Sequence, residues 1–344
     1  MDRVGSAGQP SGLSSNASEQ NMSTEKESRT IAVVGTGQMG PAIAQCCAMA
    51  GHDTIVVARS RASVERARES VQSNLQAMLP YGLLRQEDIP SLLSRISYRE
   101  DGFAAVAAAG LIIECVTEDL PLKQELFAEL ECTCRRDAIL LSTTSGLRCT
   151  DIAARMKRPE RAIVGHYWNP PHLLPLVEVS PGEKTSPEVV DAVIAFLRTT
   201  GHTPVVCRRE VLGFVANRLQ QALQREALAL VERGIATPQE VDDAVKTGFG
   251  ARTPVLGVFE HMDLVGLDLI EYLHNYILGD LDAQRHANAI LTERVQRGDL
   301  GAKTGKGFYD WSRKSAADVL RERDTLLLEL AAKRMKQARK VDQD

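Results

Sequence analysis

The sequence predicts an α/β domain followed by an all-helical domain. Up to about residue 210, short apolar runs alternate with segments of helical period, which is typical of a parallel sheet covered by helices. From Gly213 onward almost every segment has helical period. The 344 residues are enough for two domains. We therefore expect a disordered tail at 1–28, an α/β domain at 29–210, a helical domain at 211–313 and a C-terminal helix at 314–344.

The composition is that of an ordinary globular chain, with 44% hydrophobic and 25% charged residues. The formal net charge of -4 gives no support to nucleic acid or an anionic membrane as a partner. No apolar run approaches the ~20 residues of a membrane helix. The first 28 residues have almost no large apolar side chains and no signal-peptide core, which indicates a loose tail on a cytoplasmic protein.

The seven cysteines are scattered and indicate reduced core residues rather than a disulfide framework. Four of them lie in apolar helix or strand patterns: Cys46, Cys47, Cys115 and Cys207. Cys132 and Cys134 have no second Cys or His pair nearby, so we expect no metal site.

The first apolar run, Thr30 to Val34, leads directly into a glycine-rich loop. Helical spacing follows as far as Gly51. A strand, a glycine loop and a helix in this order bring backbone N–H groups close to a pyrophosphate, so we predict dinucleotide binding. The residues expected to bind the cofactor in this loop are Gly35, Gly37, Gln38, Met39 and Gly40.

The second strand, Thr54 to Val57, sets the expected cofactor preference. Proteins that bind NAD usually end this strand with an acid that holds the ribose 2′-OH, but here Ala58 stands at that point. Arg59 and Ser60 follow and could hold a 2′-phosphate. We therefore favour NADP, with NAD and a solvated Arg59 as the alternative.

Residues 61–95 have the pattern of a helical pair, and two further buried strands follow at about Leu111–Val116 and Ala138–Leu141. Ligands in such sheets lie beyond the carboxyl ends of the strands. The side chains that we expect there are Glu118, Thr143 and Ser145, and Lys123 lies five residues after Glu118 on the helix that follows.

The stretch from His166 to Glu178 contains the candidate catalytic pair. Two apolar runs flank a loop that contains Asn169 and two prolines, and this predicts two strands joined by a rigid turn. Such a turn would let the Glu178 carboxylate reach the His166 ring. A carboxylate on one ring nitrogen fixes the tautomer and leaves the other nitrogen to take a proton. The alternative is a buried pair that serves structure alone.

The helical half begins with a long amphipathic segment that ends at Gly234, and shorter helices follow near Pro238 and over Leu267–Ile277. Asn217 lies in the first turns of the long helix, where its low helix propensity suggests a functional role. After Lys314 an apolar stripe predicts an amphipathic helix; it contains Val319, Leu320, Leu326, Leu327, Leu330 and Met335, and it excludes Leu328. These stripes exceed what one small domain buries, so we expect a homodimer.

The chain resembles the L-3-hydroxyacyl-CoA dehydrogenases and their gulonate dehydrogenase, carnitine dehydrogenase and lambda-crystallin relatives over about residues 30–312. The motifs that carry the resemblance are Gly35–Gly40, Glu114–Leu126, Thr144–Ser145, His166–Val179, Gly213–Arg218, Asp263–Asp268 and Gly305–Tyr309. The resemblance implies a Rossmann-like domain, a helical dimerisation domain and a small-molecule hydroxyacyl substrate.

The resemblance also implies roles for single residues. His166 would be the base and Glu178 its partner. Ser145 and Asn217 would hold the substrate oxygen, while Glu118 and Lys123 would lie by the nicotinamide ribose.

The chain departs from the thioester enzymes on the expected substrate side. The sequence Asn169-Pro170-Pro171 is more similar to the gulonate and carnitine dehydrogenases, and Gly146 stands where a second serine is common. The acyl carrier therefore stays open. One alternative is a small polar hydroxy acid, held near Asn169 with Arg252 as a carboxylate clamp. A second alternative is a nucleotide-binding protein without turnover.

Overall fold

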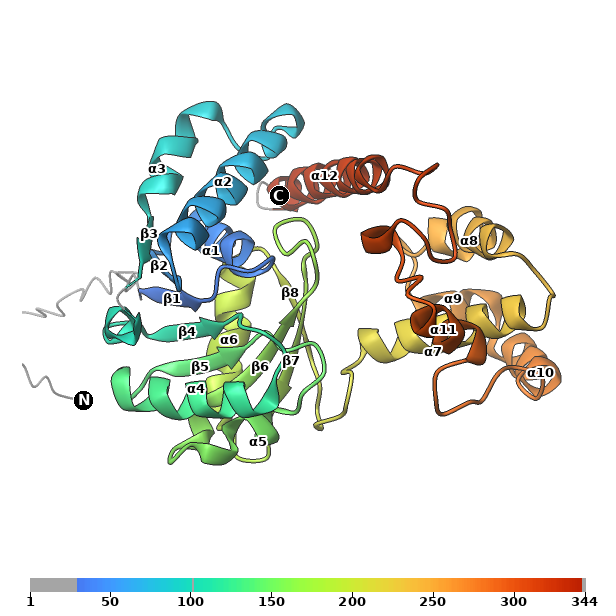
Figure 1. Ribbon diagram of the computed structural model, residues 1–344, viewed down its shortest axis with the longest axis horizontal. Coiled ribbons are helices and arrows are strands. Elements are labelled where there is room, and N and C mark those ends of the chain that lie inside the picture. The colour runs from blue at the N-terminus through green and yellow to red at the C-terminus, as the bar shows by residue number, and fades with distance from the viewer. Residues whose placement is uncertain (1–29, 101, 342–344) are drawn as a thin grey trace, which may run out of the picture.

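The computed structural model describes residues 30–100 and 102–341, so the tail expected at 1–28 lies outside the described residues. A sheet covered by helices is followed by a separate group of helices, which confirms the predicted fold class (Figure 1). In chain order the first elements are β1 (Ile31–Val34), α1 (Gly40–Met49), β2 (Thr54–Val57), α2 (Arg61–Met78), α3 (Ile89–Ser94), β3 (Ile96–Arg99), β4 (Leu111–Glu114), α4 (Leu120–Thr133), β5 (Ile139–Ser142), α5 (Cys149–Ile152), β6 (Ala162–Tyr167), β7 (Leu176–Pro181), α6 (Pro187–Thr199) and β8 (Thr203–Val206).

The sheet has the strand order β3-β2-β1-β4-β5-β6-β7-β8. The first six strands run parallel, β7 is antiparallel to β6, and β8 is parallel to β7. The carboxyl ends of β1, β2, β4, β5 and β6 therefore meet at one edge, where a ligand site is expected.

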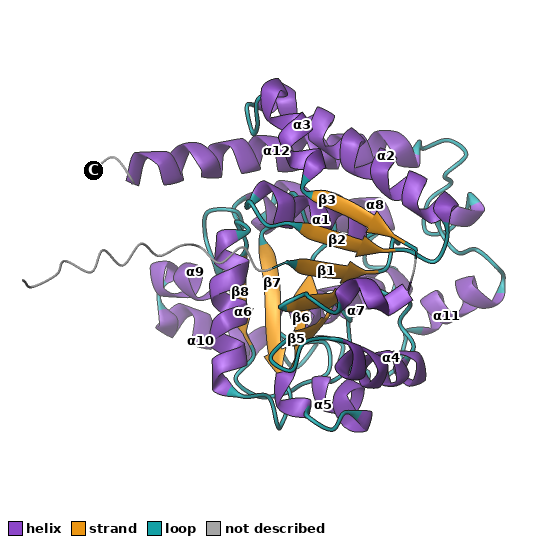
Figure 2. Ribbon diagram, turned by 90° about the vertical axis from the view of Figure 1, so that its left-hand side faces the viewer, coloured by secondary structure: helices purple, strands orange, loops and turns teal. Residues whose placement is uncertain are grey.

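The strands at the centre are apolar on both sides because helices cover both faces of the sheet (Figure 2). Ile31 and Val33 of β1 pack with side chains of α1, α2 and α6. Ala32 and Val34, which point the other way, pack with side chains of α4 and α5. Two cores therefore hold the ends of the parallel strands in fixed positions.

The expected helical pair at 61–95 is confirmed, but the strand that follows it was not predicted. The segment forms α2 and the short α3, and β3 follows directly as an edge strand. Only Ile96 of β3 is buried, so the strand has too little apolar character to stand out in the sequence.

The helical group contains α7 (Ala216–Glu232), α8 (Pro238–Thr247), α9 (Val258–Val265), α10 (Leu267–Ile277) and α11 (Ala289–Gln296). We did not predict the short helices α9 and α11. Among residues 215–320 only Ala229 and Asn288 are buried, whereas Phe259 is 79% exposed and Tyr276 is 80% exposed. One copy of the chain therefore gives this group of helices almost no core.

The last helix, α12 (Ala316–Val341), returns to the sheet domain and lies beside α2 (Figure 1). Leu328 is its buried contact and packs with Met78, Leu83 and Leu173. The expectation that Leu328 lies off the apolar stripe was therefore wrong, and Leu326, placed on the stripe, is 56% exposed. No helix in the described part of the chain is both long and apolar enough for a bilayer crossing.

Candidate active site

A histidine and a glutamate face each other across β6 and β7. His166 is the register partner of Glu178, and Nδ1 of its ring lies 3.0 Å from Oε2 of the carboxylate. Both side chains are buried. The antiparallel pairing of the two strands therefore fixes the relative position of the two groups.

The Glu178 carboxylate contacts three groups besides His166. Trp168 donates from Nε1 to Oε2 at 3.0 Å, and the backbone N–H groups of Val215 and Ala216 donate to Oε1 at 2.8 and 2.6 Å. The two backbone groups belong to the start of α7. Glu178 thus joins β7 to the first helix of the helical half.

These contacts favour an ionised Glu178 and a His166 ring that carries its hydrogen on Nδ1. Burial acts most strongly on the pKa of Glu178 and raises it, but the hydrogen bonds from His166, Ala216, Trp168 and Val215 together hold the pKa below its ordinary value. An ionised carboxylate only accepts hydrogen bonds, so Nδ1 of His166 carries the hydrogen. Nε2 is left with a lone pair that can accept a proton.

The residues implied in holding a substrate oxygen come from both halves of the chain. Asn217, in the first turn of α7, donates from Nδ2 to the backbone carbonyl of Ser145 at 2.9 Å. Ser145 follows β5 and its side chain is exposed. The structure therefore brings Ser145 and Asn217 into direct contact.

A buried ion pair lies beneath this region. Nζ of Lys123 is 2.6 Å from Oε1 of Glu114 and 3.5 Å from Oε2 of Glu118. Ser142 also donates to Glu114, while Glu118 accepts from the hydroxyl of Thr144 and the backbone N–H of Ser145. Lys123 is 1% exposed, so its ammonium group pairs with the half-exposed Glu118 from the buried side.

Sequence reasoning did not select Glu114 or Trp168 as site residues. Glu114 ends the apolar strand β4, and a charged residue at that point is a signal that we could have used. Trp168 stands one residue beyond the end of β6, and no pattern in the sequence pairs it with Glu178.

The glycine loop after β1 has the tight geometry of a phosphate cradle. Gly35 has φ of 118°, and a Cβ at Gly40 would clash with the carbonyl oxygen of Gly35. A Cβ at Gly37, by contrast, would meet nothing within 4 Å. Gln38 and Met39 complete the loop before α1 begins at Gly40. The backbone is thus tightly packed between Gly35 and Gly40, and it leaves open space at Gly37, where a pyrophosphate would approach.

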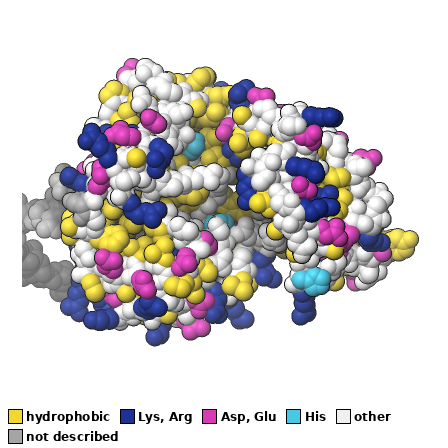
Figure 3. Space-filling model, in the orientation of Figure 1, with side chains coloured by type: hydrophobic (Ala, Val, Ile, Leu, Met, Phe, Trp, Pro, Cys, Tyr) yellow, Lys and Arg dark blue, Asp and Glu magenta, His cyan; other side chains and the backbone are white. Residues whose placement is uncertain are grey.

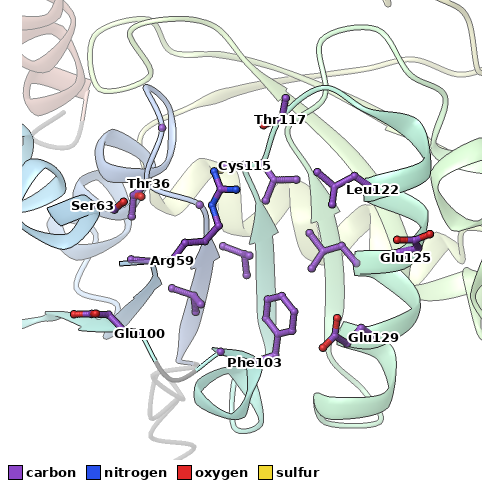
Figure 4. A pocket seen from close by; sticks show the side chains of 18 of the residues that line it. Thr36, Arg59, Ser63, Glu100, Phe103, Cys115, Thr117, Leu122, Glu125 and Glu129 are labelled. Atoms are coloured by element: carbon purple, nitrogen blue, oxygen red, sulfur yellow. The ribbon is translucent and has the colours of Figure 1, made fainter. Parts of the chain in front are cut away.

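A cavity of about 920 Å³ continues from this loop along β2 and β4 (Figure 4). Arg59 extends over it, while Glu100 at its rim points away from the guanidinium. Ser63 and Arg66 also line the cavity, and Arg66 donates to the Ser63 hydroxyl at 3.2 Å. The Ser60 hydroxyl is the N-cap of α2 and accepts from the backbone N–H of Ser63.

The other predicted residues lie farther along the chain. Thr143 is half-buried, and its backbone N–H donates to the carbonyl of Glu114. Asn169 is exposed and precedes a cis peptide bond to Pro170. Arg252 is exposed after the short turn Phe249–Ala251. Within the described residues no group of three or more His, Cys, Asp or Glu side chains is placed to hold a metal ion.

The surface is hollowed between the sheet domain and the helical group on the face shown in Figure 3. Hydrophobic side chains line much of this hollow. A substrate that reached both the end of β5 and the start of α7 would lie between the two halves.

Two family models match almost the whole described chain. The model described as the NAD binding domain of 3-hydroxyacyl-CoA dehydrogenase matches residues 30–211, and the model of its C-terminal domain matches residues 213–311. α12 lies beyond both matches.

The chain is similar to several characterised proteins. It is 32% identical to 5-formyl-3-hydroxy-2-methylpyridine 4-carboxylate 5-dehydrogenase from Mesorhizobium japonicum, over 86% of this chain and 94% of that protein. It is 32% identical to 3-hydroxybutyryl-CoA dehydrogenase from Clostridioides difficile, over 82% and 99%. It is 40% identical to L-carnitine dehydrogenase from Burkholderia mallei, over 69% and 73%.

The solved structures agree with these sequence matches. A crystal structure of the 5-formyl-3-hydroxy-2-methylpyridine 4-carboxylic acid 5-dehydrogenase, described as an NAD+ dependent dismutase, superposes with a TM-score of 0.81. It is 32% identical, and the superposition covers 87% of this chain and 96% of that one.

Proposed function

Because the chain belongs to the 3-hydroxyacyl-CoA dehydrogenase family, we propose that it catalyses the reversible oxidation of the secondary alcohol of an L-3-hydroxyacyl substrate. Membership makes it an oxidoreductase that acts on CH–OH groups with a nicotinamide dinucleotide. The observation that carries the proposal is the buried contact between His166 and Glu178.

In this proposal His166 is the general base. Its Nε2 takes the hydroxyl proton, and the Glu178 carboxylate stabilises the imidazolium that forms. The nicotinamide, when bound, supplies the hydride acceptor. Ser145 and Asn217 hold the oxygen as its charge changes, and their contact across the two halves supports this role. A positioned base contributes ~10²–10⁴-fold to the rate.

The substrate is tested with a panel of 3-hydroxyacyl-CoA esters and free 3-hydroxy acids, each offered with NAD and with NADP. His166→Gln should abolish turnover of every substrate while cofactor still binds, as measured by fluorescence titration. His286→Gln is the matched control, because His286 is exposed in the helical half. Near-normal kcat in His166→Gln would remove the ring from the mechanism.

A small polar free acid is the second candidate substrate. The 40% identity with an L-carnitine dehydrogenase favours it. Arg252 would then clamp the carboxylate, with Asn169 on the same substrate. In the panel, a free acid that outperforms every CoA ester, with loss of that preference in Arg252→Gln, would decide for this candidate.

We further propose that NADP is the preferred cofactor. Arg59, Ser63 and Arg66 line the same cavity, and Ala58 supplies no acid for a ribose 2′-OH. The family domain is described as NAD binding, so the ratio of kcat/KM with the two cofactors is the deciding measurement.

The proposed partner is a second copy of the chain. The helical group exposes large apolar side chains on α9 and α10, and single copies of globular domains rarely do so to this extent. Light scattering at micromolar concentration should give twice the monomer mass of 37.6 kDa, and a monomer would contradict the proposal.

A further inference from the structure

Trp168 stands at the centre of the catalytic cluster without a role in the reaction as proposed above. Its Nε1–H donates to the same carboxylate oxygen, Oε2 of Glu178, that contacts His166. The rings of Trp168 and His166 lie 5.8 Å apart between centroids. The indole is half-buried, and its polar edge points toward the carboxylate.

From this shared acceptor we infer that Trp168 is a positioning residue that limits the basicity of His166 by drawing on the charge of Glu178. The inference rests on the proposed function of the His166–Glu178 pair. A donor on Oε2 stabilises the negative charge there and weakens its pull on the imidazolium. Trp168 would thus keep His166 neutral, and able to accept a proton, at a lower pH than the glutamate alone would allow.

The surroundings of the cluster leave few other groups that could produce this effect. The start of α7 presents two backbone N–H groups to Glu178, and the Arg218 guanidinium donates to the carbonyl of Leu212. Beyond β8, the Cys207 thiol interacts with Glu178; burial raises the pKa of Cys207, so the thiol stays neutral at physiological pH. Phe214 covers the ring without a titratable group.

The direct test is Trp168→Phe, which keeps an aromatic ring and removes the Nε1–H. The chain has two tryptophans, so Trp311→Phe is the matched control. Removing a charge-assisted hydrogen bond should move the midpoint of the His166 titration upward by on the order of 0.5 to 1 pH unit. The measurement is histidine-ring NMR, with the His166 signal assigned from its absence in His166→Gln.

The same shift should appear in catalysis. In the direction of alcohol oxidation, the acid limb of kcat/KM should move to higher pH, so activity on that limb falls roughly three- to ten-fold. The plateau of kcat should change much less. If Trp168 only filled space, its replacement would lower the plateau or the stability and leave the limb in place. An unchanged NMR midpoint in a folded Trp168→Phe protein would overturn the inference.

A second measurement needs no change at Trp168. In Trp311→Phe one indole N–H signal remains, and it should titrate with the same midpoint as the His166 ring. An indole signal that ignores this titration would equally overturn the inference. Because both NMR readouts are independent of turnover, they separate the two proposals: a shifted midpoint without activity on any substrate refutes the proposed function alone.

Discussion

Replacing Glu178 with glutamine is the most informative single change, because glutamine keeps the shape of the side chain but not its hydrogen bonding. The carboxylate accepts at both oxygens, two bonds at each. If the amide oxygen of the introduced glutamine accepts from Val215 and Ala216, its NH₂ group faces Trp168 and His166. The two N–H donors of the amide then face the N–H groups of Trp168 and His166, and no acceptor is left between them.

The expected cost follows from these contacts. His166 can respond by moving its hydrogen to Nε2, but that tautomer cannot accept the substrate proton. Trp168 has no such option, so its N–H loses its acceptor, at a cost of about 1–3 kcal/mol in the free energy of unfolding. We expect kcat to fall within the ~10²–10⁴-fold that a general base contributes. Urea unfolding and steady-state kinetics measure the two effects, with Glu183→Gln, an exposed residue, as the control.

The pH dependence of stability gives an independent check. The pKa of Glu178 is lowered in the folded protein, so its contribution to stability is present at neutral pH and is lost as the pH falls through that lowered value. The difference in unfolding free energy between the unaltered protein and Glu178→Gln should therefore shrink in acid. A Glu178→Gln protein with wild-type kcat and an unchanged unfolding curve would refute the whole account of the carboxylate.

Three further changes test other parts of the site. Asn217→Ala should lower kcat by more than it weakens cofactor binding, because it removes the bond to Ser145; wild-type kinetics would leave Asn217 a structural role. Ala58→Asp with Arg59→Ile should shift kcat/KM toward NAD, since a charge-assisted bond of ~1.5–3 kcal/mol to the 2′-phosphate is lost; an unchanged ratio would mean that Arg59 makes no such bond to the cofactor. Gly40→Ala should prevent folding of the loop, because the new Cβ would clash with Gly35. Gly37→Ala, with open space around it, should lower cofactor affinity and leave the melting temperature unchanged. Equal melting temperatures for the two variants would contradict the close contact between Gly40 and Gly35.

The sequence predicted the parts of the fold whose signal is local. β1, α1 and β2 were found because glycines and β-branched runs mark them directly, and the pair of strands around His166 was found from its prolines. β3 was missed because an edge strand needs only one buried residue. The contact of Trp168 with Glu178 depends on strand register, and the bonds from Val215 and Ala216 depend on how two domains meet, so neither leaves a pattern in the sequence.

The position of Leu328 shows the same limit. A helical stripe identifies which residues could be buried together, but the neighbouring surface decides which of them are. Met78, Leu83 and Leu173 form the surface that receives α12, and they come from two distant segments of the sheet domain. The prediction of an amphipathic helix was correct, and Leu327 and Met335 of the expected stripe pack in this cluster, but Leu328 was wrongly left out of it.

The return of α12 to the sheet domain has a mechanical consequence. The helical half leaves the sheet domain after β8, and the chain comes back to it where Arg334 donates to the carbonyl of Leu173, in the loop between β6 and β7. The helices between these two points are therefore attached to the sheet domain at both ends of their segment. A domain attached through a single linker can change its orientation freely, whereas a domain attached at two points can rotate mainly about the axis through those points. The two attachments therefore restrict how far the halves can move apart, and the second attachment lies on the loop that follows His166.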